Sequence, residues 1–193
     1  GGGRDSGLFE EFVMTQVPQA VIWLVSAVLV EAAVIDGRQL RVPNWLTFHF
    51  ALGGLVFAAW SGGREMLLWS LAGTGVGLIS LLPLYAIGGM GAGDVKLMAG
   101  VGAWLGPVLT FWAFVCSALV GGLLGVAMIL ASGNVIRHWV MFQTIGHEIL
   151  SIRNPAVLAE RAGERKKNTM LLPYAIPIAI GSIACFGWMG LFF

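Results

Sequence analysis

The chain has 193 residues, of which 58% are hydrophobic and only 11% are charged, and its formal net charge is +1. Soluble domains carry about a quarter charged residues, so the composition excludes an ordinary soluble domain and predicts an integral membrane protein. The near-neutral charge indicates no nucleic-acid partner. Cys116 and Cys185 stand in separate apolar runs without a CxxC pair, so no zinc module is expected.

The transmembrane segments can be placed in chain order. Residues 1–16 open with GGGRDSG and lack a starting Met, so we expect a leader or expression remnant followed by a short N-terminal segment. The rest, 17–193, is expected to form one transmembrane domain. A bilayer core needs about 20 apolar residues per helix, and Pro107, which has no backbone N–H, is expected to break the longest apolar run. About six spans are predicted, at 17–35, 44–60, 66–87, 94–105, 107–131 and 171–192.

The distribution of basic residues predicts the orientation of these spans. Six spans place both termini on one side of the membrane, and basic residues favour the cytoplasmic side. With both termini outside, nine of the eleven basic residues fall on the inner side. The segment at about 133–169 is then a cytoplasmic loop. Part of it has apolar residues at helical spacing, which fits an amphipathic helix on the inner membrane face or a helix packed under the bundle.

Two aspartates occupy unusual positions. Asp36 ends the first expected span and Asp94 begins the fourth, so the topology places both at the cytoplasmic edge of the bilayer. A carboxylate at membrane depth is costly and usually faces a cavity or a partner. Each also has a simpler interpretation. Asp94 can cap the fourth helix, and Asp36 can be an interfacial residue beside Arg38.

Paired carboxylates suggest a specific chemistry. Two that lie close together cannot both ionise easily, so the pair holds one proton and titrates as a unit. The ionised member can take a proton from water while the protonated member polarises a scissile carbonyl. The flanking Gly91 and Gly93 let a substrate backbone approach closely, or simply form a flexible loop. Lys96 lies about 200° around the helix from Asp94 and is expected to extend to the inner interface instead.

Glycines inside the predicted spans suggest close helix contacts rather than chemistry. Gly73 and Gly77, and likewise Gly121 and Gly125, have the small-xxx-small spacing. These pairs are expected to be places where two helices cross.

Three separated motifs resemble the type IV prepilin peptidases, a class of GxGD intramembrane aspartic protease. GAGDVKLMAGVGAWLG (91–106) resembles their GxGD region, and IDGRQLRVPNWLT (35–47) resembles their first-aspartate region. LLPYAIPIAIG (171–181) resembles the Pro-Tyr segment that opens their last helix. The resemblance implies an all-α, polytopic transmembrane helix bundle of the aspartic intramembrane protease type, in which 17–193 is the peptidase domain. It implies Asp36 and Asp94 as the catalytic pair, with Gly91 and Gly93 as the GxGD glycines.

Other residues, Lys96 among them, are expected to bind the substrate or shape the site. Pro43 can fix the entry to the second span, together with Asn44, and so aim Asp36, or it can form an ordinary turn. Pro173 and Tyr174 can line the active site, or Tyr174 can be an interfacial anchor.

The resemblance also implies an activity. It implies cleavage of prepilin leader peptides at the inner membrane face, between a short basic leader and an apolar helix. Neither a metal nor an organic cofactor is expected, and the implied partners are prepilins, membrane lipid and pilus-assembly proteins. Bifunctional members carry a cytoplasmic insert with paired cysteines and also methylate the new N-terminus. Only about nine residues separate the first two spans here, so we expect a peptidase without methyltransferase activity, as in the short members of tight-adherence (Flp-type) pilus systems.

Two other functions fit the same residues. Intramembrane carboxylates also serve proton or cation relays in small transporters, although the two halves of the chain show no convincing repeat. A non-catalytic assembly subunit is the other alternative, and it predicts that both aspartates can be replaced without loss of function.

Overall fold

The computed structural model describes residues 17–86, 89–131 and 173–192. The expected leader (1–16) and cytoplasmic loop (133–169) lie outside these residues. The described part of the chain is all helical, as predicted, and contains no strand. Its helices are α2 (Gln19–Gln39), α3 (Asn44–Ala86), α4 (Ala92–Ala131) and α7 (Ala175–Trp188).

Two of these helices are interrupted at glycines. In α3, Gly62 and Gly63 have non-helical backbone angles, and Gly63 has a positive φ of 59°. In α4, Gly106 has φ 73° and ψ 178°, directly before Pro107. A positive φ is readily adopted only by glycine, and proline cannot continue the backbone hydrogen-bond ladder. Both interruptions fall where the sequence predicts the end of one span and the start of the next.

The helix lengths fit a membrane bundle. In the described part of the chain, α2, α3 and α4 are each long and apolar enough to cross a membrane, and α7 is a shorter apolar helix. The interruptions divide α3 and α4 into halves, but the number of crossings is not fixed by helix length alone. The expected six spans therefore stay a prediction.

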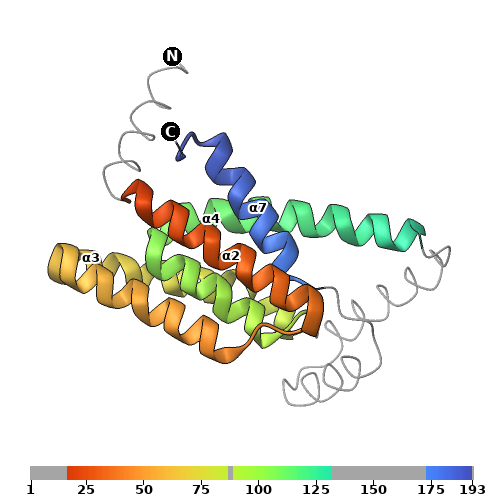
Figure 1. The fold of residues 1–193 in the computed structure, drawn as a ribbon, viewed down its shortest axis with the longest axis horizontal. Coiled ribbons are helices and arrows are strands. Elements are labelled where there is room, and N and C mark those ends of the chain that lie inside the picture. The colour runs from red at the N-terminus through yellow and green to blue at the C-terminus, as the bar shows by residue number, and fades with distance from the viewer. Residues whose placement is uncertain (1–16, 87–88, 132–172, 193) are drawn as a thin grey trace.

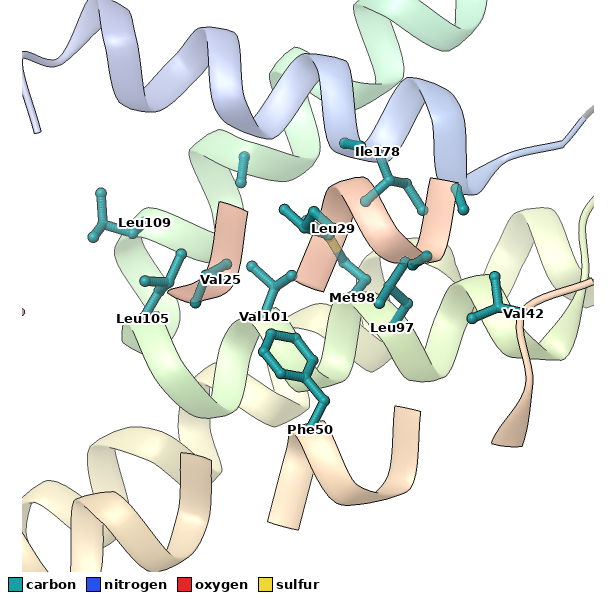
Figure 2. Packing of buried hydrophobic residues seen from close by; sticks show 14 of the residues in the cluster. Val25, Leu29, Val42, Phe50, Leu97, Met98, Val101, Leu105, Leu109 and Ile178 are labelled. Carbon is teal, nitrogen blue, oxygen red and sulfur yellow. The ribbon is translucent and has the colours of Figure 1, made fainter. Parts of the chain in front are cut away.

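The first half of α4 lies at the centre of the bundle and packs against α2, α3 and α7 (Figure 1). Its side chains between Asp94 and Gly106 are almost all buried. Figure 2 shows Met98 and Val101 of this segment beside Leu29 and Val25 of α2, with Phe50 of α3 on another side. Because neighbouring helices surround this segment, the position of Asp94 at its start is fixed by packing with all of them.

Close helix crossings explain most of the predicted glycine contacts. A Cβ at Gly73 would clash with the backbone of Gly102, and one at Gly77 would clash with the backbone of the same α4 segment. A Cβ at Gly121 would make ordinary contact with α7. At Gly125, no atom of the described residues lies within 4 Å of a Cβ position, so the contact expected there is not seen.

Candidate active site

Asp36 lies buried in the last turn of α2, with 3% of its surface exposed. The helix ends just beyond it at Leu40, which adopts a left-handed conformation (φ 53°) and donates its N–H to the Asp36 carbonyl oxygen at 2.8 Å. The carboxylate Oδ2 accepts a hydrogen bond from the backbone N–H of Ala175 at 3.0 Å. Ala175 is the first residue of α7, so Asp36 joins the first and last described helices.

The contact with Ala175 is favourable in two ways. The first N–H groups of a helix have no partner within the helix, and the carboxylate satisfies one of them. The N-terminal end of a helix also carries a partial positive charge that complements an anion.

Asp94 is buried in the first turn of α4, with 6% of its surface exposed. Its Oδ2 accepts the N–H of Gly91 at 3.0 Å. Gly91 directly precedes the helix, and an acidic side chain three residues later that reaches back to this N–H is half of a capping box. Asp94 therefore does cap the start of α4 through this hydrogen bond. It does not exclude a chemical role, because the same bond holds the carboxylate in one orientation.

The start of α7 lies next to both acids. Tyr174 directly precedes Ala175 and interacts electrostatically with Asp94, while Ala175 itself binds Asp36. Figure 1 shows the end of α2 and the start of α7 at the same end of the bundle. Pro173 begins this turn, and its carbonyl accepts the N–H of Ile176 at 3.2 Å. The start of α7, with Pro173 and Tyr174 before it, therefore lies beside Asp36 and within electrostatic range of Asp94.

The segment between α2 and α3 packs against the start of α4. A Cβ at Gly93 would lie 2.8 Å from the carbonyl oxygen of Val42. Glycine is therefore needed here for close approach of two protein segments, and not only for access of a substrate. Pro43 directly precedes α3, and its carbonyl oxygen accepts the N–H of Thr47 at 3.3 Å, which starts the hydrogen-bonding pattern of that helix.

A hydrogen bond between Lys96 and Asn44 connects the starts of α4 and α3. Lys96 Nζ donates to Asn44 Oδ1 at 2.9 Å, and both side chains are exposed. Lys96 is exposed, and its expected extension to the inner membrane interface stays a prediction. Its hydrogen bond to Asn44 was not anticipated, because the two residues are 52 positions apart.

The sequence missed the contribution of Ala175. Its backbone N–H orients Asp36, and no side chain marks this role. The indirect signal was the Pro-Tyr pair immediately before it, which marks the start of a helix. Among residues 17–86, 89–131 and 173–192, no three His, Cys, Asp or Glu side chains gather in a group that could hold a metal ion.

Comparison with known proteins identifies the family. The model of the Type IV leader peptidase family matches residues 23–126, which is more than half of the chain and includes both aspartates. The chain belongs to this family. No solved structure matches it significantly.

Curated relatives of this family member are prepilin leader peptidase/N-methyltransferases. The protein from Aeromonas hydrophila is 36% identical over 114 residues, covering 55% of this chain and 39% of the relative. The protein from Neisseria gonorrhoeae is 31% identical over 138 residues, which cover 62% of this chain and 46% of the relative. That from Bacillus subtilis is 34% identical over 113 residues, covering 58% and 44%. The matched region thus spans less than half the length of these relatives.

Proposed function

We propose that this chain is an intramembrane aspartyl endopeptidase that removes the leader peptide from type IV-like (Flp-type) prepilins at the cytoplasmic face of the inner membrane. The observation that carries the proposal is the arrangement of two buried acids around one helix start. Asp36 accepts the N–H of Ala175, Asp94 accepts the N–H of Gly91, and Tyr174, directly before Ala175, lies within electrostatic range of Asp94. Membership of the Type IV leader peptidase family supports the same activity.

The proposed chemistry uses the two carboxyl groups in opposite protonation states. The ionised one takes a proton from a water molecule, whose oxygen attacks the scissile carbonyl carbon. The protonated one donates a hydrogen bond to the carbonyl oxygen, where negative charge develops. Collapse of the tetrahedral intermediate breaks the C–N bond, and a proton passes to the leaving amine.

The ordered backbone contacts keep both carboxyl groups ready for this reaction. Each group uses its Oδ2 for a protein N–H, from Ala175 or from Gly91. These bonds hold the side chains in fixed rotamers before the substrate binds. Preorganisation of this kind lowers the cost of reaching the transition state. We expect the partly buried Tyr174 ring to restrict water near Asp94 and to contact the substrate backbone.

The substrate is expected to have an apolar transmembrane helix and a short basic leader. A peptide carbonyl in an intact helix is hydrogen-bonded and shielded, so the chain must be extended at the cut. The acids lie at one end of the bundle rather than at its midplane. This position fits cleavage of a peptide bond at the end of the substrate's transmembrane helix. We expect cleavage without methylation, because only residues 40–43 connect α2 with α3.

The decisive experiment is coexpression with a candidate prepilin, followed on a gel by the size of the precursor. Asp36→Asn and Asp94→Asn are compared with wild type at equal membrane expression. Asparagine retains a carbonyl oxygen for the N–H of Ala175 or Gly91, so the fold is preserved while the acid is lost. We expect cleavage by wild type and none by either variant. Cleavage by either variant would remove that residue from the mechanism. Ion flux in liposomes that needs Asp36, without proteolysis, would favour the transporter alternative.

A further inference from the structure

An apolar groove runs between α2 and α7, and its lining on α7 begins at Ile176, next to Ala175 of the candidate active site. It has a volume of about 560 Å³ and is lined only by aliphatic side chains. Val30 and Val34 form its wall on α2, and Ile176, Ile180 and Ile183 form much of its wall on α7. We propose that this groove binds the transmembrane helix of the substrate and presents the adjoining peptide bond to the two aspartates. The proposal rests on the proposed function.

On each helix, one end of the groove lies close along the chain to the hydrogen bond between Asp36 and Ala175. On α2 its wall ends at Val34, two residues before Asp36. On α7 its wall begins at Ile176, next to the Ala175 N–H that binds the Asp36 carboxylate. A chain that follows the groove towards this end therefore approaches the buried hydrogen bond between the two helices. An apolar helix seated here would have its end, and not its middle, at the acid.

The shape of the groove favours a helix over a lipid chain. Its α7 residues lie at positions 176, 179, 180, 183 and 184, which is one face of a helix and extends for about 12 Å. Rows of side chains at this spacing form ridges that fit between those of another helix. Ala33, Ala179 and Ala184 lie among the larger residues, and small residues allow helices to approach closely in membranes.

The side chains of the walls are also preorganised. Valine and isoleucine have one strongly preferred χ1 rotamer in a helix, so the exposed Val30, Val34 and Ile180 lose little freedom when a partner helix packs on them. The absence of any polar side chain among the lining residues excludes the basic leader, so the apolar helix is the part of the substrate that fits.

Photo-crosslinking in a catalytically inactive background tests the contact itself. A photoreactive amino acid replaces Ile180 or Val34 in the Asp94→Asn variant, which retains uncut precursor. We expect crosslinks to the apolar helix of the precursor from both positions. Phe48 provides a matched control, because it is 65% exposed and lines a different groove of about 570 Å³ between α3 and α4. Crosslinks from Phe48 but not from Ile180 and Val34 would overturn the proposal.

A space-filling substitution tests whether occupancy of the groove matters for cleavage. Ala184 is exposed in the groove at the end away from Asp36, and Ala72 is an exposed alanine on α3. We expect Ala184→Trp to lower kcat/KM for the full precursor by about tenfold or more, since a tenfold change requires the loss of only a modest part of the helix contact. Ala72→Trp should leave kcat/KM unchanged.

The same variants with a short soluble peptide separate docking from chemistry. The peptide contains the cut site but not the apolar helix, so Ala184→Trp should cleave it at the wild-type rate. Wild-type cleavage of the full precursor by Ala184→Trp would overturn the groove proposal. If wild type itself cleaves neither substrate, the proposed function fails, while the crosslinking result still decides whether the groove binds the helix.

Discussion

Replacement of Gly73 by alanine tests how closely α3 and α4 cross. A Cβ at this position would come closer to the carbonyl oxygen of Gly102 than real Cβ atoms approach any atom, and it would also clash with the backbone of Gly106. Neither neighbour is a flexible side chain that can move aside. The two helices must therefore separate by roughly 1 Å, which forfeits a quarter to a half of the dispersion energy of each affected contact.

The expected magnitude is the balance of two effects. Overpacking of this kind costs about 1–3 kcal/mol. Alanine in a helix gains up to about 1 kcal/mol over glycine. Because the strained contact is with backbone on both sides, we expect a net loss of roughly 1–2 kcal/mol in the free energy of unfolding. Dispersion contacts are a main source of helix association in membranes, so little else compensates.

Gly75 provides the control, because it lies on the same helix two residues away and a Cβ there would meet no atom of the described residues within 4 Å. The free energy of unfolding is measured by SDS titration in mixed micelles for wild type, Gly73→Ala and Gly75→Ala. Gly75→Ala should be as stable as wild type or more stable, by up to about 1 kcal/mol. If Gly73→Ala is as stable as Gly75→Ala, the two helices do not cross as closely as described.

Three further substitutions test single contacts by the same titration. Ser70→Ala removes the buried hydrogen bond to the Ala103 carbonyl, which joins α3 to α4, and should lower the free energy of unfolding by about 0.6–1.5 kcal/mol. The control Ser61→Ala, at an exposed position on the same helix, should leave the free energy of unfolding unchanged. Trp104→Phe keeps an aromatic ring but loses the indole N–H donated to the Phe50 carbonyl, and should cost about 1 kcal/mol; full wild-type stability would show that this bond contributes nothing. Leu40→Gly removes a side chain from a left-handed position (φ 53°) and should raise the free energy of unfolding by roughly 0.5–1 kcal/mol. A lower free energy of unfolding would indicate that contacts of the exposed leucine contribute more than the backbone strain costs.

Much of the helix arrangement was predictable because its signals are local. The break at Gly106 follows from the Pro107 that comes directly after it, and the break at Gly62 and Gly63 falls in the short polar SGGRE segment. The expectation that Asp36 and Asp94 lie at one end of the bundle came from the predicted direction of each span. These inferences need only hydropathy, backbone chemistry and an alternating topology.

The contacts between distant segments were not predictable from local signals. The bond from Ala175 to Asp36 crosses 139 positions and uses a backbone N–H, which every residue except proline possesses. Spacing alone also predicted a contact at Gly125 that is not seen among the described residues, although Gly121, the other member of the pair, lies near α7. The small-xxx-small pattern shows that a close approach is allowed, but the direction in which the helix leaves the bundle decides whether it occurs.

The bond between Asp36 and Ala175 has a consequence for biosynthesis. Asp36 is made early and Ala175 late, because they lie in the first and last described helices. A ribosome therefore completes most of the chain before the N–H that orients this carboxylate exists. Under the proposed function, the protein can cleave peptides only after α7 has inserted against α2. Other newly made membrane helices nearby therefore do not meet a complete active site while the chain is still being synthesised.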